Sequence, residues 1–124
     1  MTRLQRSLAA TFTAEGILHF IRPRDYEATV PAYIPISPRD AVRWSGVAEI
    51  VGGLAVIPTP TRRLARWWLT GLLVAVFPAN LHMALHPEDV AGRGVGIDRI
   101  PRRLLFARLP LQALFIAWVW RATE

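Results

Sequence analysis

Apolar residues are grouped along this chain in long blocks separated by short polar segments, without the alternation of a half-buried strand. Four blocks cover about residues 4–21, 41–57, 64–86 and 104–120. A helix that crosses a bilayer needs about 20 mostly apolar residues, which is close to the length of each block. The pattern predicts an all-α fold, an integral membrane four-helix transmembrane bundle forming a single domain over residues 1–124.

Proline and glycine mark the connections between these predicted helices. Pro23 follows Arg22 and ends the first block, and Pro58 and Pro60 predict a turn after the second. Residues 23–38 contain too many prolines to span and are expected to lie at the membrane interface. The glycines of residues 92–96 predict a flexible link before the last helix. With four spanning helices, both termini are expected on the same side of the membrane.

The third block gives the clearest indication of a membrane. The 21 residues from Trp67 to Pro87 carry no formal charge when the histidines are neutral. Four tryptophans are expected at one level of the bundle, beside three arginines, as in an interfacial belt. These residues are Trp67, Trp68, Trp118 and Trp120, with Arg62, Arg63 and Arg66.

Composition and charge agree with a multi-pass membrane protein. Hydrophobic residues make up 52% of the 124 residues, and the net charge is +6. The basic residues are all arginines, and most of them lie at the ends of the apolar blocks, which is typical of membrane flanks and argues against a nucleic-acid partner. The arginines divide almost evenly between the two sides, with an inclination toward cytoplasmic termini. The first helix is expected to be retained and not cleaved as a signal peptide. The absence of cysteine excludes thiol redox chemistry, disulfides and thiolate metal sites.

Polar residues recur at similar depths in all four predicted helices, counted at about 1.5 Å of rise per residue. A four-residue spacing from Ser7 through Thr11 and Glu15 to His19 predicts an inward stripe on the first helix, and Ser45, Glu49 and Gly53 predict another on the second. The sequence therefore predicts an intramembrane polar pocket. Its candidate residues are Glu15, His19, Glu49, Asn80, His82, Arg108 and Gln112, with His86 nearer the surface.

Several uses of this pocket stay open from the residues alone. Arg108 can neutralise Glu15 or Glu49, so that the network only fixes helix register. A quinone or another lipophilic molecule can bind there, with Trp44 and Phe20 as apolar walls. A proton or solute path is a further alternative. A transition-metal site is another, with candidate ligands Glu15, His19, Glu49, His82 and His86, although a neighbouring arginine repels a metal ion.

Four segments resemble the DoxX-like family of small bacterial membrane proteins. They are Gly16-Ile-Leu-His-Phe20, Val30-Pro-Ala-Tyr-Ile-Pro35, Ser45-Gly-Val-Ala-Glu-Ile-Val-Gly-Gly-Leu54 and Phe77-Pro-Ala-Asn-Leu-His-Met83. The resemblance implies a four-helix protein of the bacterial inner membrane. It also implies an accessory or ligand-binding role beside a redox system, or a membrane subunit of a quinone-linked oxidoreductase. The expected partners are the lipid bilayer and a membrane redox enzyme or a second copy of the chain. The sequence indicates no catalytic residue, and whether the protein is an enzyme stays open.

Overall fold

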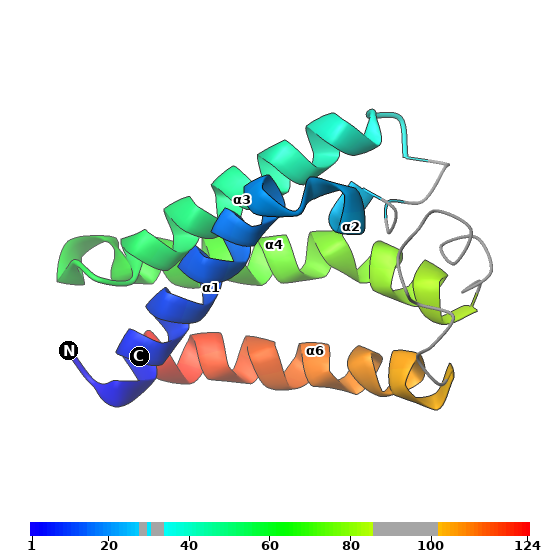
Figure 1. Cartoon of the computed structure of the whole chain (residues 1–124). Helices are drawn as coiled ribbons and strands as arrows, with labels where there is room; N and C mark the ends of the chain where they lie inside the picture. Colours follow the sequence, from blue (N-terminus) through cyan, green and yellow to red (C-terminus); the bar gives the residue numbers. More distant parts are fainter. Residues whose placement is uncertain (28–29, 31–33, 86–101) are drawn as a thin grey trace.

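Every regular element in the described part of the chain is a helix. The computed structural model describes residues 1–27, 30, 34–85 and 102–124. Its elements are α1 (Arg3–Ile21), α2 (Pro23–Glu27), α3 (Pro38–Ala55), α4 (Thr59–Leu85) and α6 (Arg102–Ala122) (Figure 1). The all-α prediction is confirmed. The predicted glycine link and His86 lie outside the described residues.

Capping side chains set the starts of α1 and α3. Thr2 Oγ1 accepts a hydrogen bond from the backbone N–H of Gln5 at 3.1 Å, and the Gln5 side chain accepts one from the Thr2 N–H at 3.0 Å. This is a capping box. Ser37 Oγ accepts from the Asp40 N–H at 3.2 Å, and Pro38 takes the first helical position. The apolar pattern placed the start of α3 at about residue 41, because the capping turn itself is polar.

The connection between α3 and α4 is shorter than the prolines suggested. α4 begins at Thr59, so Pro60 lies in its first turn, where a missing N–H removes no helical hydrogen bond. Thr61 Oγ1 donates to the Ala55 carbonyl at 2.7 Å, and Arg62 Nε donates to the Val56 carbonyl at 2.9 Å. These side chains satisfy carbonyls that the end of α3 leaves free. The prediction that the third helix begins at about residue 64 was therefore too late.

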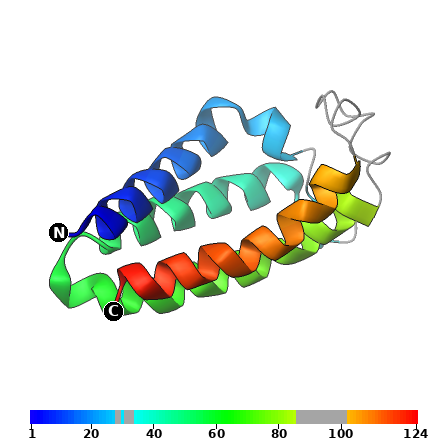
Figure 2. The same cartoon turned by 90° about the horizontal axis from the view of Figure 1, so that it is seen from below.

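The long helices form two pairs. α1 packs on α3, and α4 packs on α6 along their lengths, with further contacts between α3 and α4 and between α1 and α6. In Figure 1, α4 and α6 lie alongside each other while α1 and α3 are inclined to them. Both termini lie at the same end of the molecule as the α3–α4 turn (Figure 2). We call this the terminal end.

Glycines allow the helices to approach closely. A Cβ atom on Gly16 would lie 2.6 Å from the Gly46 carbonyl oxygen, and one on Gly53 would lie 2.8 Å from Thr13 Oγ1. Gly52 plays the same part between α3 and α4, where its Cβ would meet the side chain of Leu69. Close approach through small residues is the usual way in which apolar helices pack inside a membrane.

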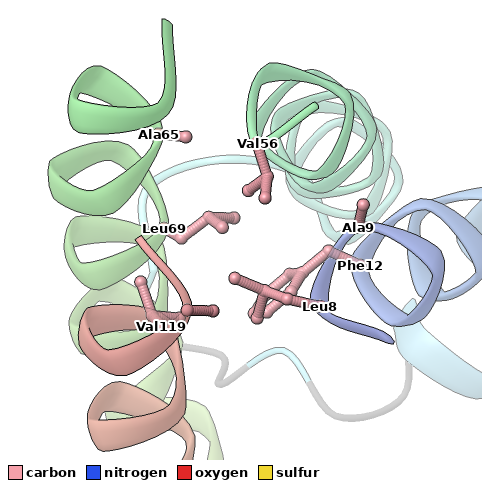
Figure 3. Close-up of a cluster of buried hydrophobic side chains, with 8 residues drawn as sticks. Leu8, Ala9, Phe12, Val56, Ala65, Leu69 and Val119 are labelled. Carbon is pink, nitrogen blue, oxygen red and sulfur yellow. The ribbon is translucent and has the colours of Figure 1, made fainter. Parts of the chain in front are cut away.

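The fully packed core is small and lies near the terminal end. It joins α1 to the end of α3, the start of α4 and the end of α6 (Figure 3). Many other large apolar side chains point away from the bundle, including Trp44 at 72% exposed and Leu64 at 71%. The core residues are Leu8, Ala9, Phe12, Val56, Ala65, Leu69, Val119 and Ala122.

One helix in the described part is long and apolar enough to cross a membrane. It covers the 24 residues Thr59–His82, with a mean hydropathy of 1.3 in its most apolar window. Only 17% of that window is buried within the molecule. By length and composition alone, this helix is a candidate for a membrane span.

Candidate functional site

His19 is the centre of a polar cluster between α1, α2 and α3. Its Nδ1 atom donates a hydrogen bond to the Glu15 carbonyl oxygen at 2.7 Å and lies 3.3 Å from Glu49 Oε2. A carbonyl can only accept, so the Nδ1 hydrogen points to Glu15. In the neutral ring the other nitrogen, Nε2, is then an acceptor.

Glu49 lies across from His19 on α3 and is largely buried, with 15% of its side chain exposed. Its Oε2 atom has no hydrogen-bond partner among the described residues, because the His19 hydrogen is used elsewhere. Gly46, one turn earlier, makes room for the histidine, since a Cβ there would lie 2.9 Å from His19 Cβ. The backbone of α3 thus places a buried carboxyl oxygen, free of hydrogen bonds, beside His19.

Tyr26 completes the cluster from α2. The helix α1 ends where the Arg22 N–H bonds the Leu18 carbonyl at 2.8 Å, and α2 begins at Pro23. The Tyr26 ring then stacks on His19 with centroids 3.9 Å apart, and its hydroxyl donates to Glu15 Oε2 at 3.1 Å. Burial first, and then the Glu15 carboxylate, raise the pKa of Tyr26 to about 12.

The sequence pattern did not identify Tyr26 as a site residue. It predicted only a segment at the membrane interface, and the direction in which the chain returns after Pro23 is not encoded in any local motif. An aromatic residue seven positions after His19, just beyond a proline, was the available signal. We use the name polar cluster below for Glu15, His19, Tyr26 and Glu49.

A second polar contact joins α4 to α6. Gln112 is buried and donates from Nε2 to the Leu73 carbonyl, and Asn80 Nδ2 donates to Gln112 Oε1 at 3.3 Å. Pro78 interrupts the backbone hydrogen bonding of α4 in this region. The structure therefore brings the candidate residues together as two groups, one in each helix pair, and not as one layer shared by four helices.

Arg108 does not join either group. It is exposed on α6 and forms no ion pair with Glu15 or Glu49. His19 takes the place beside Glu49 that was expected for the arginine. His82 is partly buried on α4 and has interactions of its own. His86, the last candidate, lies outside the described ranges.

The other expected features of the pocket are only partly found. Trp44 and Phe20, expected as apolar walls, are 72% and 47% exposed. Within residues 1–27, 34–85 and 102–124, no group of three or more His, Asp or Glu side chains is arranged to hold a metal ion.

The expected inward stripe on α1 is wrong except at its end. Ser7 and Glu15 are exposed and Thr11 is half-buried, whereas His19 is buried. A residue four positions along an α-helix is turned by about 40° from the first, because one turn takes 3.6 residues. Three such steps rotate His19 by about 120° from Ser7, so the two cannot share one inward face. The buried face of α1 consists of Gln5, Leu8, Ala9, Phe12, Gly16 and His19.

The fold and the site define a class of all-helical proteins in which a carboxyl, imidazole and phenol cluster lies between two closely packed helices. The chain belongs to the family described as domain of unknown function (DUF8561), whose model matches residues 8–123. Neither the curated proteins nor the solved structures give a match to the chain.

The resemblance to the DoxX-like family is wrong, because the matching family model is a different one and no DoxX-like match is found. The glycines of residues 45–54, one of the segments that suggested it, have a general structural role. Gly46 and Gly53 permit close contact with α1. Any tightly packed pair of helices has such needs, so these motifs do not define a family. The bacterial inner membrane and the redox-enzyme partner were implied by that resemblance, and its loss removes their support.

Proposed function

We propose that this protein is a multi-pass membrane protein in which α1, α3, α4 and α6 cross the bilayer and the polar cluster binds a small lipophilic molecule that carries a hydroxyl donor. A hydroquinone is the ligand class that fits this description. The membrane part rests on the exterior of the helices, and the ligand part rests on the unbonded oxygen of Glu49.

The exterior of the bundle supports lipid as its surroundings. Large apolar side chains point outward from each long helix, among them Ile21 at 67% exposed, Val74 at 57% and Leu114 at 65%. Each Å² of such surface costs about 25 cal/mol in water, and soluble monomers rarely expose contiguous apolar patches above a few hundred Å². Lipid chains remove this cost.

Helix length supports the same proposal. The four long helices have 19, 18, 27 and 21 residues. At about 1.5 Å per residue they measure about 27 to 40 Å, against a hydrocarbon thickness of about 30 Å.

The ionisable side chains of these helices can avoid the lipid. Glu49 and His19 turn toward each other, and Arg108 lies six residues from the start of α6 with a side chain long enough to reach the interface.

The single observation that carries the ligand proposal is the unbonded Glu49 Oε2 atom, which lies 3.3 Å from His19 Nδ1, a nitrogen whose hydrogen is given to the Glu15 carbonyl. A buried polar atom without a hydrogen bond costs about 1–3 kcal/mol, and a ligand that supplies a donor recovers this. Glu15 is exposed at the edge of the same cluster, and the proposed route of the ligand runs past this side chain. A hydroxyl entering past Glu15 can donate to Glu49 or to His19.

Ligand-dependent thermal stability tests this proposal. The purified full chain in lipid nanodiscs is heated with decylubiquinol or with decylubiquinone, its oxidised form. We expect stabilisation by the quinol, by about 2.7 kcal/mol at 100 times its Kd. Glu49→Gln should raise the Kd for the quinol at least tenfold, while Glu27→Gln on α2 should leave this Kd unchanged. Absence of any quinol effect in the wild-type protein, or equal losses in both variants, contradicts ligand binding at the cluster.

A structural role is the second candidate, favoured by the position of the cluster next to the Gly16–Gly46 contact. In that case His19 and Glu49 fix the register of α1 against α3. This role predicts that Glu49→Gln lowers the melting temperature in the absence of ligand. The ligand proposal predicts an unchanged melting temperature for the same variant, because Glu49 Oε2 makes no hydrogen bond that the substitution could remove.

A further inference from the structure

The terminal end of the bundle carries almost all of the net charge of the protein. Its arginines come from three helices, and Glu124 is the only acidic side chain in residues 1–14, 50–85 and 102–124. Six arginines and one glutamate leave a net charge of +5 there, out of +6 for the whole chain. The arginines are Arg3, Arg6, Arg62, Arg63, Arg66 and Arg121.

The helix dipole does not account for the arginines at the starts of α1 and α4. Three of the six, Arg3, Arg6 and Arg62, lie among the first four residues of these helices, where the positive end of the helix dipole disfavours cations. Neither helix has an acidic residue in its first turn. An anion outside the protein would interact favourably with the positive ends of the two helix dipoles. It would also reduce the mutual repulsion of the arginines.

Two of the arginines have structural roles. Arg62 donates to the Val56 and Ile57 carbonyls at 2.9 and 3.0 Å. Arg66 donates to Thr123 Oγ1 at 3.0 Å and to the Thr123 carbonyl at 2.5 Å, and its guanidinium lies 4.8 Å from the centre of the Trp120 ring.

The other four, Arg3, Arg6, Arg63 and Arg121, are exposed. Their guanidinium groups form no hydrogen bond or ion pair with a residue that the structure describes.

Exposed aromatic and apolar side chains lie beside the arginines near the start of α4. Leu64 is 71% exposed, Trp67 is 60% exposed, and Trp67 meets Trp120 edge to face with centroids 5.1 Å apart. Indole rings with adjacent arginines are typical of the headgroup level of a bilayer. A nucleic acid would leave these apolar side chains uncovered, whereas lipid covers them.

We infer that the terminal end binds the phosphate groups of anionic phospholipids through Arg3, Arg6, Arg63 and Arg121. A guanidinium group matches the geometry of a phosphate and binds it through two parallel hydrogen bonds. The opposite end differs, because Arg22 pairs with Asp25 at 3.1 Å and Glu27 and Asp40 lie nearby in sequence. The inference rests on the proposed membrane insertion. It places the termini at the leaflet richer in anionic lipid, which is the cytoplasmic one.

Lipid selectivity tests this inference. The full chain is reconstituted into phosphatidylcholine vesicles that contain a trace of spin-labelled phosphatidylglycerol or spin-labelled phosphatidylcholine. We expect a several-fold preference for the labelled phosphatidylglycerol, which decreases as salt is raised. The combined variant Arg3→Gln, Arg6→Gln, Arg63→Gln and Arg121→Gln should lose it. The matched variant Arg22→Gln, Arg24→Gln, Arg39→Gln and Arg43→Gln, which removes the same charge at the other end, should keep it.

The two proposals fail in different ways. Protein that is washed from phosphatidylcholine vesicles at alkaline pH contradicts membrane insertion and this inference together. Inserted protein without a preference for phosphatidylglycerol contradicts the lipid site alone. Equal losses in the two matched variants would show that net charge, and not the terminal end, attracts the lipid.

Discussion

Single residues in the polar cluster depend on neighbours from other helices. His19 reaches Glu49 because Gly46 has no side chain, and Tyr26 covers His19 because α2 begins directly after α1. Depth counting from the sequence identified Glu15, His19 and Glu49, since all three lie in the half of the bundle away from the termini. It could not identify Tyr26, whose position depends on the turn at Pro23.

The ionisation of Tyr26 gives a test at this scale. Its pKa is raised to about 12 from an ordinary value of about 10, so folding favours the neutral hydroxyl. The associated stabilisation is fully present below pH 10 and is lost as the pH rises from about 10 to about 12. The absorbance at 295 nm of the wild type minus that of Tyr26→Phe should show a step near pH 12. A step near pH 10 would mean that the phenol is in water and does not cover His19.

At the scale of helices, backbone contact between α1 and α3 is a feature that the sequence revealed only in part. The stripe of Ser45, Glu49 and Gly53 predicted which face of α3 turns inward, but the partner positions Ala9, Thr13 and Gly16 come from the structure. The apolar blocks located four helices to within about five residues. They could not locate the caps formed by Thr2 and Ser37, because these residues are polar and precede the apolar blocks.

Gly16→Ala should destabilise the protein by about 1–3 kcal/mol, because its Cβ would lie 2.6 Å from both the Gly46 carbonyl oxygen and Ile50 Cγ1. Gly71→Ala on α4 is the matched control, since nothing lies within 4 Å of the added atom. That control should be neutral or stabilising by up to about 1 kcal/mol, the difference in helix propensity between alanine and glycine. The free energy of unfolding in mixed micelles measures both. Equal effects of the two substitutions would contradict the close contact between α1 and α3.

The contact between α4 and the end of α6 depends on the shape of an arginine and not only on its charge. Arg66→Lys should lose the paired hydrogen bonds to Thr123 and destabilise the protein by about 1–3 kcal/mol. Arg63→Lys makes the same exchange at an exposed neighbour and should change stability by less than about 0.5 kcal/mol. Thermal unfolding and protease sensitivity of the C-terminus report the difference. An unchanged melting temperature for Arg66→Lys would show that the contact contributes little.

At the scale of the whole molecule, the buried apolar core and the polar cluster lie in opposite halves. The core of Leu8, Leu69 and Val119 holds the helices together near the terminal end (Figure 3), and the polar cluster lies toward the other end, where α1 meets α2. Composition predicted that apolar surface exceeds what one small core can bury. It could not predict that the polar residues divide between two helix pairs, because that depends on how the pairs are inclined to each other.

The orientation of each helix across the bilayer tests the account most directly, and the natural absence of cysteine makes this measurement straightforward. Single cysteines replace four exposed residues, Arg24, Arg39, Thr59 and Glu124, and are probed in sealed membrane vesicles with a membrane-impermeant maleimide. We predict that Thr59→Cys and Glu124→Cys react from one side, that Arg24→Cys and Arg39→Cys react only from the other, and that Val74→Cys in the middle of α4 reacts from neither. Reaction of all four exposed positions from the same side, or recovery of the protein in the soluble fraction, would contradict four spanning helices.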